Sequence, residues 1–154
     1  YTPSDGTTQV ESSEDYGFKY TGVEGLTIGA ATGDDNTSAT AGVETTNMYV
    51  TYAMDAFTVG YQASEADSET ASSDVDFTAI GISYAVNDDM SISLNSSTHE
   101  YEDSTKSDQE ATGISVSYTM GSMTIKANHN TIDNIAGTAT DDRSGYALSL
   151  GFTF

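Results

Sequence analysis

The last ten residues, Gly145-Tyr146-Ala147-Leu148-Ser149-Leu150-Gly151-Phe152-Thr153-Phe154, decide the fold class of the chain. Large apolar side chains occupy every second position from Tyr146 to Phe154, and small side chains lie between them. Successive side chains of a β-strand point to opposite faces of the sheet. Strict alternation over ten residues therefore predicts a strand with one apolar face and one face of small residues.

The same alternation recurs upstream in four similar blocks. Each block places a tyrosine shortly before a short connection, and these residues are Tyr20, Tyr52, Tyr84 and Tyr118, spaced 32, 32 and 34 residues apart. The short connections centre on residues 24–25, 55–56, 87–89 and 121–122. A repeat of this size predicts repeated supersecondary units, here one hairpin followed by one long connection.

The repeats predict an all-β, antiparallel fold. We predict nine strands, at residues 16–23, 26–32, 46–54, 57–63, 76–86, 90–97, 111–120, 123–130 and 144–154. The long connections are predicted at residues 33–45, 64–75, 98–110 and 131–143, and residues 1–15 resemble the end of another. Residues 1–154 are expected to form a single region with no separate second domain.

Composition excludes several classes of protein. The 154 residues include 24 Asp and Glu against 4 Lys and Arg, which gives a formal net charge of -20. Nucleic acid is excluded as a partner because its phosphates would be repelled. Absence of cysteine excludes disulfides and thiolate metal sites. No run of 18 apolar residues predicts a transmembrane helix. No signal peptide is visible, and Tyr1 predicts a processed or missing start.

The acidic residues are unevenly placed along the chain. Nineteen of the 24 fall in the long segments, among them Glu65, Asp67 and Glu100, and the other five fall at turns or at a strand start. We therefore expect no acid in the middle of a strand. A Lys or Arg side chain that faces lipid at the bilayer midplane destabilises the folded barrel by about 2–4 kcal/mol. An acidic side chain at the same place destabilises it by less. The charge map therefore favours strands that cross a membrane.

Alternation assigns the strand residues to two faces. The apolar face is predicted to contact lipid, and the polar face is predicted to line a water-filled lumen. The predicted lumen residues are Lys19, Thr58, Gln62, Ser83, Ser91, Ser93, Asn95, Ser115, Ser117, Thr124, Lys126 and Asn128. The four repeat tyrosines Tyr20, Tyr52, Tyr84 and Tyr118, with Phe152 and Phe154, are predicted to form an aromatic row at one membrane interface.

Catalytic and metal sites find little support in the residue pattern. His99 is placed in a long loop and His129 near the outer end of a strand, without identifiable catalytic partners. We therefore assign no catalytic residue and do not expect an enzyme. Carboxylates at residues 34–35 or 141–142 could bind Ca²⁺ or Mg²⁺ in a loop, but the spacing matches no calcium loop. No other cofactor is expected.

The terminal alternation, the final Phe154, the hydroxylated face and the acidic long segments resemble the carboxy-terminal part of a Gram-negative general diffusion porin. The resemblance implies an outer-membrane homotrimer of sixteen-stranded barrels that passes small hydrophilic solutes and ions by passive diffusion. It also implies contacts with membrane lipid and lipopolysaccharide, and with the barrel assembly machinery through the last strand. Sixteen strands need about 275 residues, so we expect a longer parent chain, whose constriction loop cannot be assigned here.

Two other interpretations fit the alternation. One is a small outer-membrane barrel with a plugged interior and an adhesive or structural role. The other is a soluble β-sandwich with a similar role, because a sandwich also alternates apolar and polar residues along its strands.

Overall fold

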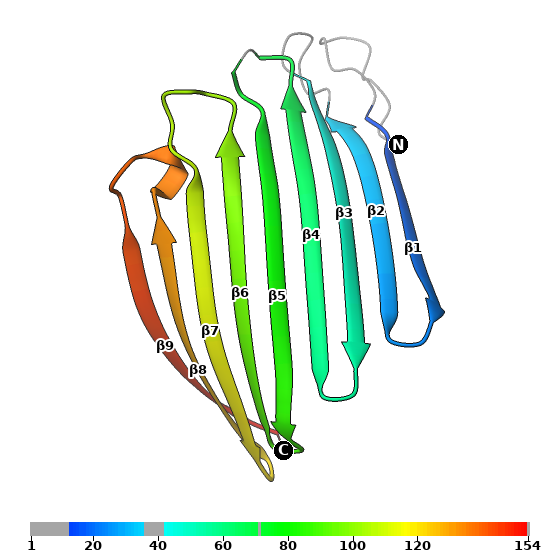
Figure 1. The fold of residues 1–154 in the computed structure, drawn as a ribbon, viewed down its shortest axis with the longest axis vertical. Coiled ribbons are helices and arrows are strands. Elements are labelled where there is room, and N and C mark those ends of the chain that lie inside the picture. Colours follow the sequence, from blue (N-terminus) through cyan, green and yellow to red (C-terminus); the bar gives the residue numbers. More distant parts are fainter. Residues whose placement is uncertain (1–12, 36–41, 71, 154) are drawn as a thin grey trace.

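The computed structural model describes residues 13–35, 42–70 and 72–153. Its strands are β1 (Asp15–Val23), β2 (Leu26–Asp35), β3 (Val43–Met54), β4 (Phe57–Ser68), β5 (Val75–Asn87), β6 (Met90–Tyr101), β7 (Gln109–Met120), β8 (Met123–Asp133) and β9 (Arg143–Phe152). They form one sheet in the order β1 to β9, and each strand pairs antiparallel with the next (Figure 1). The prediction of an antiparallel all-β fold with nine strands is confirmed.

Short turns lie at one end of the sheet and longer connections at the other (Figure 1). Two-residue turns join β1 to β2, β3 to β4, β5 to β6 and β7 to β8. Gly25 and Gly121 lie in two of these turns with φ of 75° and 60°, the left-handed region that glycine adopts without a steric penalty. Hairpin turns of two residues favour this region because its twist matches that of the flanking strands.

The strands extend further toward the long connections than the sequence predicts. The described parts of the connections are residues 69–70, 72–74, 102–108 and 134–142, so several residues assigned to loops lie in strands. The placement of Glu65, Asp67, Glu100 and His99 in connecting segments is therefore wrong. The predicted strands end where apolar alternation stops, but backbone pairing continues because it does not depend on the side chain.

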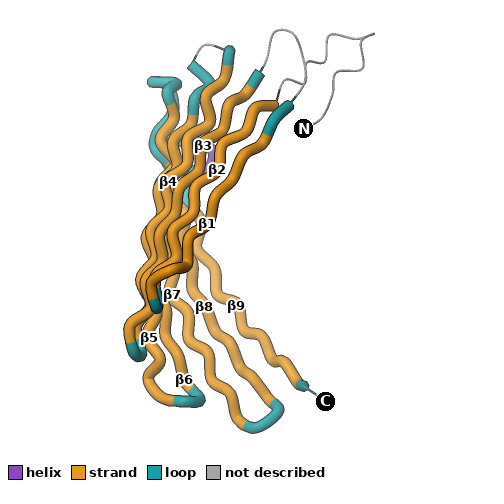
Figure 2. The backbone as a smooth tube through the Cα atoms, turned by 90° about the vertical axis from the view of Figure 1, so that its right-hand side faces the viewer, coloured by secondary structure: helices purple, strands orange, loops and turns teal. Residues whose placement is uncertain are grey.

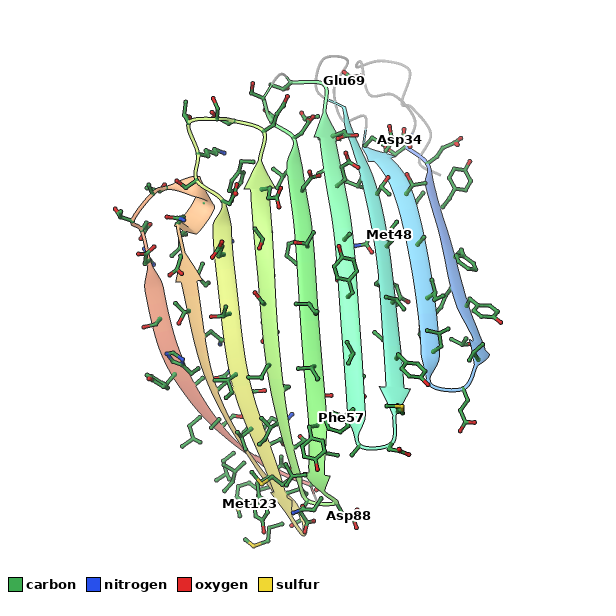
Figure 3. All side chains as sticks on the ribbon, viewed as in Figure 1. Asp34, Met48, Phe57, Glu69, Asp88 and Met123 are labelled. Atoms are coloured by element: carbon green, nitrogen blue, oxygen red, sulfur yellow. The ribbon has the colours of Figure 1, made fainter. Side chains whose placement is uncertain are left out.

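The sheet has no hydrophobic core of its own. Among the described residues no hydrophobic side chain is buried, and on β9 Tyr146 and Leu148 remain 85% and 76% exposed. Figure 2 shows that the sheet is strongly curved, with a hollow side and a bulging side. Figure 3 looks onto the convex side, where the labelled Phe57 lies with other apolar residues. In the described part of the chain, no helix is long and apolar enough to cross a membrane.

Strand register fixes which residues share each face. Ladder partners lie on the same side of the sheet, so the pairs Phe57–Tyr84, Val59–Ile82 and Met90–Tyr118 continue one apolar face around the convex side. The intervening pairs, such as Thr58–Ser83 and Ser93–Ser115, form a polar face on the concave side. Every predicted lumen residue falls on this polar face, and their role as channel lining stays a prediction.

Candidate functional site

The polar face forms a continuous wall of small hydroxyl and amide side chains. Between β3 and β4, the amide of Asn47 donates to the hydroxyl oxygen of Ser64 over 2.6 Å, and the amide of Gln62 donates to the same oxygen over 3.2 Å. Between β6 and β7, the Ser93 and Ser115 hydroxyl oxygens lie 2.7 Å apart. These contacts join neighbouring side chains of the polar face at short range.

A grid of small residues covers the polar face of the last four strands. Along the register, one row holds Ser91, Ser117, Lys126 and Ser149, and the next holds Ser93, Ser115, Asn128 and Ala147. A third row holds Asn95, Gly113, Asn130 and Gly145. Because every grid position except Lys126 is short, this part of the wall is open to water.

Lysine supplies the charge at mid-strand positions on the polar face. Lys19 pairs with Gly29 between β1 and β2, and Lys126 pairs with Ser117 and Ser149. Arg143, which begins β9, pairs with Ile132 on the same face and lies 3.7 Å from Asp141. Arg143 thus adds a third cation to the strands, because β9 begins one residue before the predicted strand 144–154. Strands β3 to β9 carry no acidic residue on the polar face.

Larger side chains gather on the polar face toward the long connections. Rings of Phe77 and His99 lie 4.7 Å apart between centroids, and Gln109 contacts the Nδ1 atom of His99 at 3.4 Å. The Lys106 ammonium lies 4.7 Å from the centroid of the Tyr101 ring, a cation–π contact. His99 is thus part of a packed polar and aromatic cluster on the polar face of β5, β6 and β7, where Phe77 and Gln109 are its neighbours among the described residues.

Hydrogen bonds join the connections at residues 102–108 and 134–142, next to this cluster. The backbone N–H of Ser107 donates to the carbonyl of Gly137 over 3.0 Å, and the Asn134 amide donates to the Asp108 carbonyl over 3.0 Å. Within the first connection, the Thr105 hydroxyl and backbone N–H donate to Asp103, which lowers the pKa of that carboxyl. The connections therefore form an ordered rim with defined contacts.

The convex face carries an aromatic row beside the short turns. Tyr84 and Phe57 stack with their ring centroids 4.5 Å apart, and Tyr20, Tyr52, Tyr118 and Phe152 occupy equivalent positions on the same face. Phe154, predicted for this row, lies outside the described residues. Closer to the long connections on the same face, the His129 ring stacks on the Tyr146 ring with centroids 4.2 Å apart. Placement of the row at a membrane interface stays a prediction.

Acidic residues occupy the convex face at its other edge. Glu44 pairs with Asp67, and Asp76 pairs with both Glu65 and Glu100. Like charges directly opposite each other destabilise a sheet, so these residues require water or counterions around them. The acids of β3 to β9 therefore lie on the convex face, toward the long connections, whereas Asp15 of β1 pairs with Gly33 on the polar face. Among the described residues, no three His, Asp or Glu side chains converge to hold a metal ion.

Sequence reasoning missed the aromatic residues on the polar face. Tyr49 and Phe77 follow the same alternation as Thr51 and Ala79, so counting by two along each strand would have placed them on that face. Tyr49 lies over Gly29 on the neighbouring strand, where a Cβ atom would collide with its ring. This glycine makes room for the Tyr49 ring, which crosses from β3 toward β2.

Comparison with known proteins identifies relatives of this architecture. The sequence profile of the Gram-negative porin family matches residues 1–109. Two mutant structures of the porin of Rh. blastica superpose with TM-scores of 0.71 and 0.70, at 17% and 18% identity, over 97% of this chain and 48% of theirs. Outer-membrane expressed OmpT of Vibrio cholerae superposes with a TM-score of 0.60 at 17% identity, over 92% of this chain and 56% of that one. Curated protein sequences give no match. The chain thus spans about half the length of the first structures it resembles.

Proposed function

This chain belongs to the Gram-negative porin family, and we propose on that premise that it forms part of the wall of a water-filled channel for small hydrophilic solutes and ions. The bacterial outer membrane is its location. Passage is by passive diffusion, set by the pore diameter and by the field of the wall charges. Together with the remaining wall it builds a sixteen-stranded barrel, and three copies assemble into a trimer.

The observation that carries this proposal is the contrast between the two faces. The convex face is apolar from Phe57 through Ile82 to Leu94, and its residues stay exposed because no protein layer covers them. The concave face carries hydroxyl and amide groups, with lysine at mid-strand. A curved sheet that is apolar outside and polar inside is the arrangement of a transmembrane barrel with an aqueous interior.

The two alternative interpretations lack this support. A β-sandwich requires a second sheet against the apolar face, and the described residues form one sheet. A small plugged barrel requires large side chains to fill its interior, whereas the middle of the polar face of β6 to β9 is lined, apart from Lys126, by serine, alanine, glycine and asparagine.

The proposed partners follow from the surfaces. Membrane lipid covers the apolar convex face, and lipopolysaccharide contacts the acidic edge above it through bridging divalent cations. The barrel assembly machinery binds the carboxy-terminal strand.

Solute flux through the natural full-length porin tests this function. Proteoliposomes swell in isotonic sugar when the sugar enters through a channel, so the swelling rate should fall steadily with sugar size for the wild-type protein. Liposomes without protein and liposomes with heat-denatured protein provide the baseline. Swelling no faster than this baseline, from protein shown to be folded and inserted, would exclude the diffusion channel.

A further inference from the structure

The connection between β8 and β9, residues 134–142, folds onto the polar face at the start of β7. Its short helix η1 (Ile135–Gly137) lies next to that end of β7 (Figure 1). The backbone N–H of Ala136 donates to the side-chain oxygen of Gln109 over 2.8 Å. Gln109 and its ladder partner His99 both lie on the polar face. We call residues 134–142 the β8–β9 segment, and we call the end of the polar face away from the short turns the mouth.

Lysine 106 makes a second contact that places the β8–β9 segment on the polar face. The Lys106 side chain lies against Gly137, where a Cβ atom would come within 2.8 Å of it. Its ammonium lies over the ring of Tyr101, which shares the polar face with Phe77 and His99. Two separate contacts therefore hold this segment on the channel side of the wall.

The β8–β9 segment has a strained backbone and few attachments. Ala136 and Thr140 have φ of 54° and 67°, left-handed values that a residue with a side chain rarely adopts. Such values cost free energy and persist where surrounding contacts hold them. Among the described residues, three hydrogen bonds attach the segment to the rest of the chain, and their partners are the Gln109 side chain and the backbones of Ser107 and Asp108. Loss of one attachment should therefore let the segment leave the wall.

Gln109 couples one of these attachments to the protonation of His99. Because its oxygen accepts the Ala136 N–H, its amide nitrogen points to the His99 Nδ1 atom, 3.4 Å away. An amide nitrogen only donates hydrogen bonds, so this Nδ1 atom must accept, as it can in the neutral imidazole. A protonated histidine donates from both ring nitrogens. Rotation of the Gln109 amide would then satisfy His99 but would turn the amide nitrogen toward the Ala136 N–H. Gln109 therefore cannot bind both partners once His99 is protonated.

We propose that Gln109 and His99 form a pH-sensitive latch, which holds the β8–β9 segment against the channel wall when His99 is neutral and releases it into the mouth when His99 is protonated. Histidine side chains ordinarily change charge between pH 5 and 8. The latch is closed above this range and opens as the pH falls through it, because the latched geometry accepts the neutral ring. This inference rests on the proposed channel, since it places the segment beside a path for solute.

No charged group competes with Gln109 for the His99 ring. The ring contacts Phe77 and Gln109, and the one ion pair of the described residues joins Arg143 to Asp141. The strand acids of β5, β6 and β7 lie on the opposite face, at Asp76, Glu100 and Glu110. Besides Tyr101 and Lys106, the two connections bring to this end of the sheet the acids Glu102, Asp103, Asp108, Asp141 and Asp142.

Hydrogen–deuterium exchange of the natural full-length porin in lipid nanodiscs tests the latch. Exchange is measured at pH 5 and pH 8 and corrected for the intrinsic rates. The wild type should lose about fivefold of its protection at Ala136 and Gly137 at pH 5, as for one hydrogen bond of ordinary net strength. His99→Phe keeps a ring beside Phe77 but does not titrate, so its protection should be the same at both pH values. Gln109→Leu lacks the latch and should show the lower protection at both.

His129→Phe is the matched control, because His129 is the other histidine of residues 1–154 but stacks on Tyr146 on the convex face. It should keep the pH dependence of the wild type. Equal protection of Ala136 at pH 5 and pH 8 in the wild type would overturn the proposal. A pH dependence that persists in His99→Phe, or that disappears in His129→Phe, would overturn it as well.

Single-channel currents in planar bilayers separate this inference from the channel itself. The released segment should interrupt the current, so the wild-type current should be steady at pH 8 and interrupted at pH 5, and Gln109→Leu should show interruptions at both. A steady wild-type current at pH 5 would overturn release into the mouth and leave the channel intact. Absence of any current contradicts the proposed function and leaves the exchange measurements to decide the latch.

Discussion

Ile82 and Ser83 are adjacent residues of β5 whose side chains lie on opposite faces of the sheet. Ile82 pairs with Val59 and Leu94 on the convex face, whereas Ser83 pairs with Thr58 and Ser93 on the concave face. One step along the chain thus moves a side chain from the proposed lipid contact to the proposed channel lining.

Arginine substitutions at these two positions should have opposite consequences. Ile82→Arg places a charge in the bilayer and should cost about 2–4 kcal/mol of folding free energy near the midplane. Ser83→Arg stays hydrated in the channel, so folded yield should be close to that of the wild type while conductance changes. Folded yield in lipid bilayers measures the difference. A greater loss for Ser83→Arg would mean that the faces are assigned the wrong way round.

Gly29 and Tyr49 form a specific steric pair on the concave face. A Cβ atom on Gly29 would collide with the Tyr49 ring, so Gly29→Ala should destabilise the folded protein by about 1–3 kcal/mol, the usual range for overpacking. Tyr49→Ala introduced with Gly29→Ala should recover most of this loss, because the ring that blocks the methyl group is gone.

Gly81→Ala is the control for this pair. It lies on the same face in the middle of β5, and its added methyl group would make an ordinary contact at 3.7 Å. Urea unfolding in lipid vesicles gives the free energies of unfolding. Similar losses for Gly29→Ala and Gly81→Ala would indicate a general intolerance of side chains, and not a contact with Tyr49.

The carboxyl of Asp103 provides a pH-dependent test of the ordered rim. Its pKa is lowered first by the Thr105 hydroxyl and then by the Thr105 backbone N–H. A lowered folded-state pKa contributes stability above the ordinary pKa, and this stability is lost as the pH falls through the folded value. We therefore expect the local order of residues 103–106 to decrease below pH 3.8, the ordinary value.

Thr105→Val removes the hydroxyl donor but keeps the backbone donor, so it should raise the Asp103 pKa part of the way to its ordinary value. Carboxyl carbon NMR during an acid titration measures this pKa. Ser104→Ala removes a neighbouring hydroxyl that donates no hydrogen bond to the Asp103 carboxyl, and it should leave the Asp103 pKa unchanged. An unchanged pKa in Thr105→Val would contradict the hydrogen bond as its cause.

The sequence predicts the two faces well because successive side chains along a strand point to opposite faces of the sheet. Once Tyr84 and Ile82 are assigned to one face, the assignments of Ser83 and of its ladder partners Thr58 and Ser93 follow without further information. The four short turns are also predictable, since each is a two-residue connection between alternating segments. These features are local, and local pattern is sufficient for them.

Other features depend on relationships that a local pattern does not contain. Strands β4 and β6 continue to Ser68 and Tyr101, past the apolar alternation. Backbone hydrogen bonds between strands form whether or not a side chain such as Glu65 or Glu100 is polar. A hollow in the polar face of β6 to β9 depends on how four strands are staggered and curved, because its lining residues come from all four. Neither stagger nor curvature can be read from one strand at a time.

Cysteine accessibility along β7 tests the central claim most directly, namely that the concave face meets water and the convex face meets lipid. Residues 1–154 contain no native cysteine, so each substitution adds a single thiol to this part of the protein. In the folded porin in lipid vesicles, a charged, membrane-impermeant thiol reagent should label Ser115→Cys and Ser117→Cys rapidly, and should leave Ile114→Cys and Val116→Cys unlabelled until the protein is denatured. Uniform labelling of all four positions, or labelling of Ile114→Cys and Val116→Cys alone, would contradict the account.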